Sequence, residues 1–287
     1  MKPVLIATSD WHLTEATPVC RKDDYVKAQW KKVDFIKELQ KELGCRVIHH
    51  GDLFDYWKPS PALLSETIEH LPAQFHTIYG NHCLPQHSYP LRIKSGVYTL
   101  EKAGALTTQE DGSWGTGDEI GFLYKESQLA KKMIGIQHIF VYKGKMPWPD
   151  CPYESAMRYM ARNNAMDLYL VGDNHTTFTI VREGKILINP GSLMRMTGAQ
   201  TEHKPCVFIY YDNHTIEKVF LPIEEGVVSR EHLEQLNQKS ARIEAFISRI
   251  KDDAMTEISF EDNLDIFFKR NKVKEEVKQL IYASLEV

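Results

Sequence analysis

Short apolar runs alternate with amphipathic stretches through the first eighty residues, and this alternation limits the folds open to the chain. Residues 22–43 place apolar side chains at helical spacing and end at Gly44, and residues 63–71 also have helical periodicity. The apolar runs are typical of buried strands and are residues 3–8, 46–50 and 75–79. This order predicts right-handed β-α-β crossovers and a mainly parallel sheet.

Beyond about residue 105 the pattern changes to a series of short strand-like runs, and one clear helix at 153–162 interrupts it. Turn-forming residues at 182–185 and 212–214 predict antiparallel pairing in this half. The runs are 119–124, 133–141, 167–171, 176–182, 185–188, 206–211 and 215–221. We therefore expect an α/β fold in which two sheets pack on each other with helices outside.

The composition shifts again near residue 229. Residues 229–251 and 272–285 have helical periodicity, and 229–287 holds 10 Lys and Arg against 12 Asp and Glu. We predict a catalytic domain over 1–225 and a helical C-terminal appendage over 226–287. The mixed charge excludes a basic nucleic-acid-binding arm.

Overall charge and cysteine content restrict the function classes. With 35 Lys and Arg against 39 Asp and Glu, the formal charge is −4, so any phosphate chemistry must come from a local site. The five cysteines are scattered without a C-x-x-C pair, which argues against a disulfide framework. No apolar run reaches the roughly 18 residues of a membrane span. The apolar stretch at the start of the chain is too short for the hydrophobic region of a signal sequence. We expect a cytoplasmic, reduced protein.

Acidic, amide and imidazole side chains follow the predicted strands, at the point where each ends. A single D-x-H or G-N-H is usually an ordinary loop, but several in order behind apolar strands favour a shared site. In open α/β sheets, ligands collect outside the carboxyl ends of the strands. Carboxylate oxygens and imidazole nitrogens together suit divalent first-row metals, so we predict a polynuclear metal site. The residues are Asp10, His12, Asp52, Asn81, His82, His138, Asp173 and His175.

The ordered series D-x-H, G-D, G-N-H, H and G-x-x-H over roughly residues 3–222 resembles the calcineurin-like metallophosphoesterase superfamily. Within it, Ser9-Asp10-Trp11-His12-Leu13 and Leu53-Phe54-Asp55 look most like the SbcD-type nuclease subunit of the double-strand-break repair complex. The resemblance implies an αββα metallophosphoesterase sandwich with a two-metal centre. One ion would bind Asp10, His12, Asp52 and His175, and the second would bind Asp52, Asn81, His138 and Asp173. His82 would be the catalytic acid that protonates the leaving oxygen.

Two positions depart from the family pattern. Asp173 stands where the family usually has His, which either favours harder ions such as Mn²⁺ over Zn²⁺ or weakens the second site. Cys83 stands where the family commonly has an acid, and this puts the positioning of His82 in question. We expect two divalent ions, Mn²⁺ first, with Mg²⁺, Fe²⁺ or Zn²⁺ as alternatives.

The expected function is a metal-dependent phosphoesterase that hydrolyses phosphodiester bonds with a two-metal-activated hydroxide, as a DNA exonuclease or endonuclease. A phosphomonoesterase, a small-molecule phosphodiesterase and a catalytically silent scaffold remain open. Arg195 is a candidate contact for substrate phosphate, with an ordinary surface arginine as the alternative. Residues 229–287 are a candidate docking element for a coiled-coil ATPase or a second copy, unless these helices pack on the chain's own core.

Aromatic residues near the expected metal loops have two interpretations. Trp11, Phe54, Tyr56 and Trp57 could stack on a base or could pack in the wall of the site. Trp148 lies in a loop near His138 that either shapes the substrate groove or is simply solvated.

Overall fold

The computed structural model describes residues 1–108, 121–122, 132–231, 242–245 and 260–285. By its internal contacts the chain divides into two compact units, Met1–Ser229 and Arg230–Val287. The predicted helix over 229–251 falls mostly outside the described residues.

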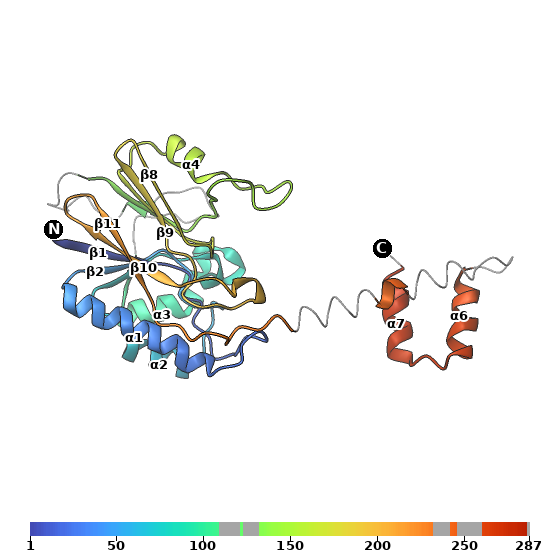
Figure 1. The fold of residues 1–287 in the computed structure, drawn as a ribbon. Helices are drawn as coiled ribbons and strands as arrows, with labels where there is room; N and C mark the ends of the chain where they lie inside the picture. The colour runs from blue at the N-terminus through green and yellow to red at the C-terminus, as the bar shows by residue number, and fades with distance from the viewer. Residues whose placement is uncertain (109–120, 123–131, 232–241, 246–259, 286–287) are drawn as a thin grey trace. The chain divides into compact units, whose positions relative to one another are not determined.

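The first sheet has the strand order β11-β10-β1-β2-β3-β4 (Figure 1). β1, β2, β3 and β4 are parallel, as the alternation of strands and helices predicted. β10 pairs antiparallel with β1 and continues through a hairpin into β11, which confirms the turn predicted at 212–214. The strands are β1 (Pro3–Thr8), β2 (Arg46–His49), β3 (Phe75–Thr77), β4 (Thr107–Thr108), β10 (Cys206–Tyr211) and β11 (Ile216–Phe220).

Three helices, α1 (Tyr25–Leu43), α2 (Pro61–His70) and α3 (Gly96–Lys102), cover the outer face of this sheet (Figure 1). The Asp24 side chain caps α1 by accepting from the Lys27 N–H, and the helix ends at Gly44 with φ of 62°. Three short 3₁₀ turns, Asn81–Cys83, Pro85–His87 and Tyr89–Lys94, precede α3. Neither these turns nor α3 has a periodic pattern that could be recognised in the sequence.

The second sheet has the order β5-β6-β7-β9-β8. The β8–β9 hairpin is antiparallel, as the turn at 182–185 predicted. The parallel pairing of β6 with β7 and of β7 with β9 was not anticipated. The parallel step arises because α4 (Ala156–Arg162) carries the chain from β6 back to β7. The strands are β5 (Gly121–Phe122), β6 (Ile134–Gln137), β7 (Leu168–Val171), β8 (Phe178–Arg182) and β9 (Lys185–Asn189).

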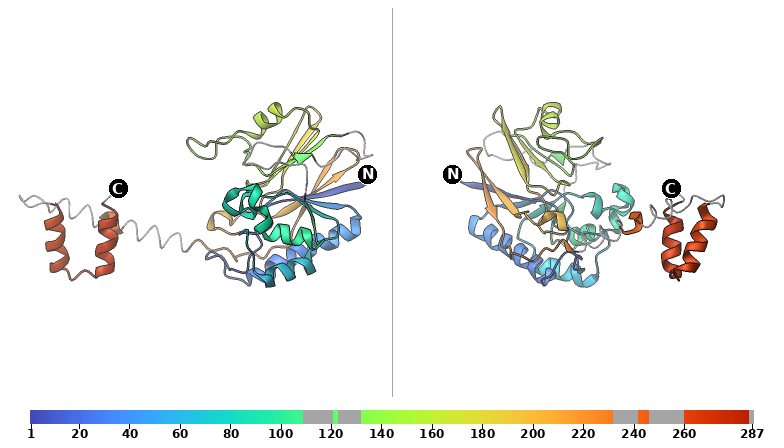
Figure 2. Two further views of the ribbon diagram at one scale, coloured as in Figure 1. Left: turned by 180° about the vertical axis from the view of Figure 1, so that it is seen from behind. Right: turned by 45° about the vertical axis from the view of Figure 1, so that its right-hand side comes forward.

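The two sheets stack face to face, and helices close both outer sides, which confirms the αββα sandwich (Figure 2). Strand alternation divides the side chains between layers: Ile6 of β1 packs against the helical layer, whereas the neighbouring Ala7 packs between the sheets. From the second sheet, Leu170 and Ile188 fill the same inter-sheet core. On the far side, Tyr159 of α4 packs with β7 and β8.

The second unit is helical and contains α6 (Phe260–Arg270) and α7 (Glu275–Ala283). Leu264, Phe268 and Ile281 form a small buried cluster within it. α7 falls inside the segment predicted as helical at 272–285, whereas α6 was not anticipated.

All five cysteines are free and buried. Among the helices that the structure describes, none combines the length and the apolar character required to cross a bilayer.

Candidate metal centre

The residues predicted to bind metal follow five different strands and meet at one edge of the sandwich. Asp10 and His12 follow β1, Asp52 follows β2, and Asn81 follows β3. From the second sheet, His138 follows β6, while Asp173 and His175 follow β7. β1, β2 and β3 are parallel in the first sheet, and β6 and β7 are parallel in the second. Within each sheet the carboxyl ends of these strands therefore meet at one edge, which is where ligands of α/β sheets bind.

The backbone at this edge adopts an uncommon conformation. Four of the ligand residues have positive φ angles, in the left-handed region that residues other than glycine rarely adopt. The angles are 50° for Asp10, 45° for His12, 57° for Asp52 and 72° for Asp173. Such residues cost about 1–3 kcal/mol each and persist where surrounding contacts hold them. Here the Asp10 N–H donates to the Gly51 carbonyl at 3.1 Å, and the His12 N–H donates to the Asp52 carbonyl at 3.0 Å.

Gly80 shows how closely these loops approach one another. A Cβ atom at this position would lie 2.2 Å from Asp52 Oδ1, so only glycine fits.

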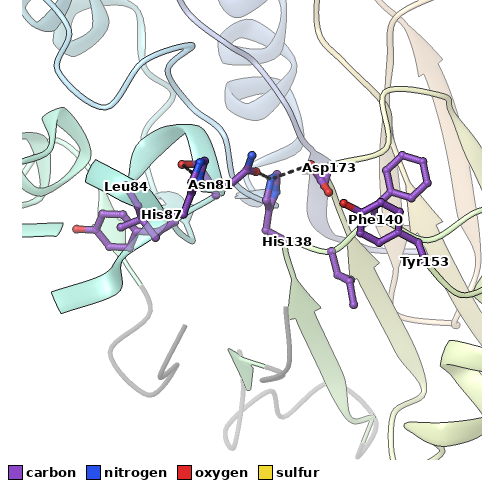
Figure 3. Close-up of a pocket in the computed structure, with 10 residues that line it drawn as sticks. Asn81, Leu84, His87, His138, Phe140, Tyr153 and Asp173 are labelled. Carbon is purple, nitrogen blue, oxygen red and sulfur yellow. Dashed lines mark hydrogen bonds and ion pairs between the residues drawn. The ribbon is translucent and has the colours of Figure 1, made fainter. Parts of the chain in front are cut away.

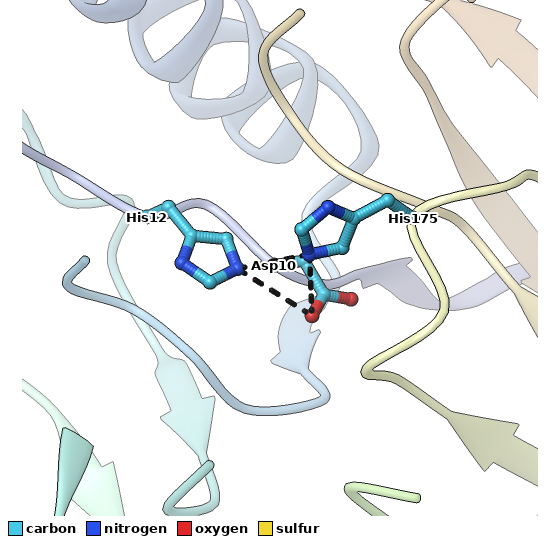
Figure 4. Close-up of side chains that lie close together, drawn as sticks. All are labelled: Asp10, His12 and His175. Carbon is cyan, nitrogen blue, oxygen red and sulfur yellow. Dashed lines mark hydrogen bonds and ion pairs between the residues drawn. The ribbon is translucent and has the colours of Figure 1, made fainter. Parts of the chain in front are cut away.

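The first group of ligand atoms comes from Asp10, His12 and His175 (Figure 4). The Nε2 atoms of His12 and His175 lie 3.1 Å apart, and each lies 3.9 Å from Asp10 Oδ1. Asp10 is held by the Ser9 hydroxyl, which donates to Oδ2 at 2.5 Å, and by the Asp173 N–H, which donates to Oδ1 at 3.1 Å.

The second group comes from Asp52, Asn81, His138 and Asp173. His138 Nε2 lies 3.0 Å from Asn81 Oδ1, 3.1 Å from Asp52 Oδ2 and 3.8 Å from Asp173 Oδ1. Figure 3 shows Asn81, His138 and Asp173 converging on one point. Asp173 therefore turns a carboxylate oxygen toward the same centre.

Asp52 belongs to both groups. Its Oδ2 atom lies 3.8 Å from His12 Nε2 and 3.1 Å from His138 Nε2, while Oδ1 accepts from the His82 N–H at 2.9 Å. The residue is only 1% exposed. A carboxylate oxygen that faces both ligand groups suits a residue that would ligate two metal ions.

The donor set fits divalent cations. The His138 Nδ1–H donates to the His50 carbonyl at 2.7 Å, so Nε2 of a neutral His138 carries only a lone pair toward the Asp52 carboxylate. Two electron-rich atoms at 3.1 Å need a positive charge between them, supplied by a proton or a metal ion. Imidazole and carboxylate donors suit first-row divalent ions.

The electrostatics of the protein alone support this fit. Burial disfavours a charged His138, but the Asp52 carboxylate outweighs burial and raises the pKa of His138 to about 10. Burial also disfavours ionised Asp52, yet His138 and His12 hold its pKa well below the usual range. The centre therefore favours positive charge at the position where the ligand atoms meet.

Asp55 is a site residue that the sequence reasoning missed. Its Oδ1 atom lies 3.4 Å from His12 Nδ1, and its backbone carbonyl accepts from His82 Nδ1–H at 2.8 Å. The second bond leaves His82 Nε2 unengaged, on a side chain that is 43% exposed. The sequence could have indicated Asp55 as a site residue, because it follows the expected ligand Asp52 by three residues in the same loop.

Replacing Asp55 by asparagine is expected to weaken metal affinity and kcat/KM by about 10–100-fold, because partners behind a ligating histidine fix its orientation and basicity. Metal titration by calorimetry, together with initial rates, measures both effects. The matched control is Asp150→Asn, since Asp150 is exposed and, like Asp55, changes only from carboxylate to amide. Unchanged metal affinity in Asp55→Asn would show that this carboxylate does not support the centre.

The two remaining sequence candidates lie in the interior. Arg195 is 6% exposed, and its guanidinium donates to the main-chain carbonyls of Thr201 and Glu224. These bonds hold the connection after β9, and the described contacts of Arg195 include no metal-ligand residue. Cys83 is fully buried in the helical-layer core, and burial raises the pKa of its thiol to about 12, so it is an unreactive packing residue.

The aromatic residues near the metal loops separate into two kinds. Trp11 and Phe54 are completely buried and pack in the core, which answers the question left open by the sequence. Tyr56 is exposed, and its ring lies 5.3 Å from that of Trp57.

Comparison with known proteins identifies the domain. A family model described as the calcineurin-like phosphoesterase superfamily domain matches residues 4–213. No curated protein matched the chain. Similar solved structures include an archaeal phosphodiesterase, with 16% identity, a TM-score of 0.44, and coverage of 76% of this chain and 99% of its own.

Two further solved structures are similar to this chain with lower TM-scores. Vacuolar protein sorting 29 from Cryptosporidium parvum has 13% identity and a TM-score of 0.37, covering 75% of this chain and 95% of its own. A conserved uncharacterised protein from Streptococcus pneumoniae, a predicted phosphoesterase, has 13% identity and a TM-score of 0.36, covering 77% of this chain and 98% of its own.

Proposed function

The chain belongs to the calcineurin-like phosphoesterase superfamily, and on that premise we propose that it is a metal-dependent phosphodiesterase with a two-metal centre. The observation that carries the proposal is Asp52 Oδ2, which faces ligand atoms of both groups. Asp10, His12, Asp52 and His175 would hold one ion, and Asp52, Asn81, His138 and Asp173 the other.

The chain's own residues supply the remaining chemistry. When bound, two divalent ions would provide a hydroxide nucleophile near neutral pH and neutralise charge on the phosphate oxygens. His82 Nε2 is placed to give a proton to the departing oxygen, because Nδ1 is engaged by the Asp55 carbonyl. The Asp52 carboxylate also holds the His82 backbone, which links the acid to the metal loops.

We propose Mn²⁺ as the preferred ion. Three carboxylates, from Asp10, Asp52 and Asp173, surround the centre, where the family pattern has a histidine in place of the last. Carboxylate oxygen is a harder ligand than imidazole nitrogen and shifts preference away from Zn²⁺. Activity restored to the chelated protein by Zn²⁺ better than by Mn²⁺ would contradict this assignment.

Two hollows border residues of the centre, and on this ground we propose a diester rather than a monoester as substrate. One of about 370 Å³ contacts Asn81, His138 and Asp173, and another of about 460 Å³ contacts His175 and His203. A phosphodiester has an ester group on each side of phosphorus and can occupy both, whereas a monoester has only one.

A substrate panel tests the proposal. The protein loaded with Mn²⁺, Mg²⁺ or Zn²⁺ is incubated with bis-p-nitrophenyl phosphate, p-nitrophenyl phosphate, and single- and double-stranded DNA. We expect turnover of the diester in the presence of metal and none in chelator. Turnover of the monoester alone would make the protein a phosphomonoesterase, and no turnover with any metal would favour the silent scaffold.

DNA is the narrower substrate proposal. It is supported by the resemblance of Ser9–Leu13 and Leu53-Phe54-Asp55 to the SbcD-type nucleases and by the exposed ring of Tyr56 beside these loops. Closed circular and linear DNA separate the two modes, because only an endonuclease cuts the circle. Hydrolysis of small diesters with neither DNA cleaved would assign a small-molecule phosphodiesterase.

We also propose that the helical unit after residue 229 binds a protein, either a coiled-coil ATPase or a second copy of the chain. The two helices bury Leu264, Phe268 and Ile281 in their own cluster but leave Ile266, Val277 and Leu280 exposed. Apolar side chains left on the surface of a small helical pair favour an interaction surface.

Deleting residues 230–287 is expected to leave a folded enzyme with unchanged diester hydrolysis, because residues 1–229 form a compact unit by their own internal contacts. Light scattering of the full and shortened chains measures self-association directly. An insoluble product would instead show that these helices complete the core of the catalytic unit.

A further inference from the structure

Three aromatic side chains gather on the segment between β6 and α4. The ring of Phe140 lies 4.7 Å from that of Tyr153 and 5.6 Å from that of Trp148, and the Trp148 and Tyr153 rings are 6.3 Å apart. Trp148 and Tyr153 are 45% and 44% exposed. This cluster, Phe140, Trp148 and Tyr153, is called the aromatic platform below.

The platform adjoins the metal centre. Phe140 and Tyr153 line the hollow of about 370 Å³ whose wall also includes Asn81, His138 and Asp173. In Figure 3 the two rings lie beyond Asp173, on the side away from Asn81 and His87. A hollow of this size accommodates a small organic group, and the expected metal ligands Asn81, His138 and Asp173 are part of its wall.

The platform is fixed in place relative to the ligands. The Asn174 side chain, between Asp173 and His175, donates to the Val141 carbonyl at 2.8 Å. The Ala156 N–H donates to the Tyr142 carbonyl at 2.8 Å, which ties the segment just after Phe140 to the start of α4. An aromatic surface held this way loses little conformational entropy when a flat group stacks on it.

We propose that the aromatic platform is a subsite for a nucleobase, so that the substrate of the proposed phosphodiesterase is a nucleotide ester or a nucleic acid. The inference rests on the proposed function, since the platform selects the ester group and performs no chemistry. A nucleobase is a flat aromatic group joined through a sugar to a phosphodiester. Stacking of bases on exposed aromatic side chains tolerates any sequence because every base has a π-face.

The position of the acid indicates which ester group stacks. The His82 ring packs edge-on against that of His12, with centroids 4.7 Å apart, and His82 does not line the hollow beside the platform. In hydrolysis, water oxygen bonds to phosphorus, the bond from phosphorus to the leaving oxygen breaks, and His82 protonates that oxygen. The base on the platform therefore belongs to the nucleoside that keeps the phosphate.

Two p-nitrophenyl esters test the subsite, one of thymidine 5′-phosphate and one of methyl phosphate. They share a leaving group and differ only in the retained ester group. We expect Tyr153→Ala and Phe140→Ala to lower kcat/KM for the thymidine ester by about 5–150-fold, equivalent to about 1–3 kcal/mol of stacking, with the methyl ester unchanged. Tyr153→Phe keeps the ring and is expected to retain the thymidine preference.

The controls separate this idea from the proposed function. Phe35→Ala removes a partly exposed aromatic ring on α1 and is expected to change neither rate. Equal loss on both esters, or no loss on either, would overturn the subsite while leaving the phosphodiesterase intact. If neither ester is hydrolysed, the proposed function fails. Calorimetric measurement of thymidine 5′-phosphate binding then tests the nucleobase subsite by itself. An affinity for thymidine 5′-phosphate that falls in Tyr153→Ala and is retained in Tyr153→Phe supports the subsite. An affinity that neither substitution changes overturns it.

Discussion

Asp52→Asn is expected to lower kcat for a diester by about 10³-fold or more. Asp52 Oδ2 lies 3.8 Å from His12 Nε2 and 3.1 Å from His138 Nε2, so the change weakens both metal positions together. Metal-ion stabilisation of a transition state supplies several kcal/mol, and each 1.36 kcal/mol changes the rate tenfold. Asparagine has nearly the same shape but no charge, so the loss reports on charge and ligation.

Metal content measured by mass spectrometry alongside the rate assigns the cause. We expect the variant to bind less than two ions per chain at concentrations that saturate the wild type, with the circular dichroism spectrum unchanged. Asp150→Asn again serves as the matched surface control. Full activity in Asp52→Asn would rule out the two-metal mechanism.

His82→Ala is expected to slow the hydrolysis of diesters with poor leaving groups by about 10²–10⁴-fold, the usual contribution of general acid catalysis. For p-nitrophenyl esters the loss should be much smaller, because p-nitrophenolate departs without a proton. The metal content should stay unchanged, since the His82 side chain is held by the Asp55 carbonyl with its Nε2 turned away from that bond.

Leaving-group dependence is therefore the decisive measurement for His82. Rates for a series of aryl esters of increasing leaving-group pKa should fall more steeply for the variant than for the wild type. His70→Ala is the control, because His70 is a partly exposed histidine that pairs with Asp34 on the helical layer. Parallel slopes for His82→Ala and the wild type would show that another group protonates the leaving oxygen.

The sequence allowed much of the centre to be predicted, for a physical reason. Parallel strands of one sheet end at one edge, so residues that follow β1, β2 and β3 must approach one another once the strands are recognised. Asp10, Asp52 and Asn81 needed no more than this rule. His138 and His175 were also predicted from their place after strand-like runs, and they follow β6 and β7 of the second sheet.

Other features depend on contacts between distant segments, which periodicity does not report. The parallel pairing of β6, β7 and β9 depends on which strands become neighbours. The sequence does not show that Arg195 is buried, because its guanidinium donates to the main-chain carbonyls of Thr201 and Glu224, which come later in the chain. The His50 carbonyl, which orients His138, carries no signal because every residue has a carbonyl.

The two ligand groups draw on both sheets, and this has a consequence for the stability of the sandwich. Asp10, Asp52 and Asn81 belong to the first sheet, while His138, Asp173 and His175 belong to the second. The complete set of ligands exists only when both sheets are folded, so metal ions would bind the folded state and not the unfolded one. Metal binding would therefore raise the free energy of unfolding by mass action. A cation present at 100 times its dissociation constant adds about 2.7 kcal/mol to the free energy of unfolding. Cellular metal supply would then govern the lifetime of the enzyme as well as its rate.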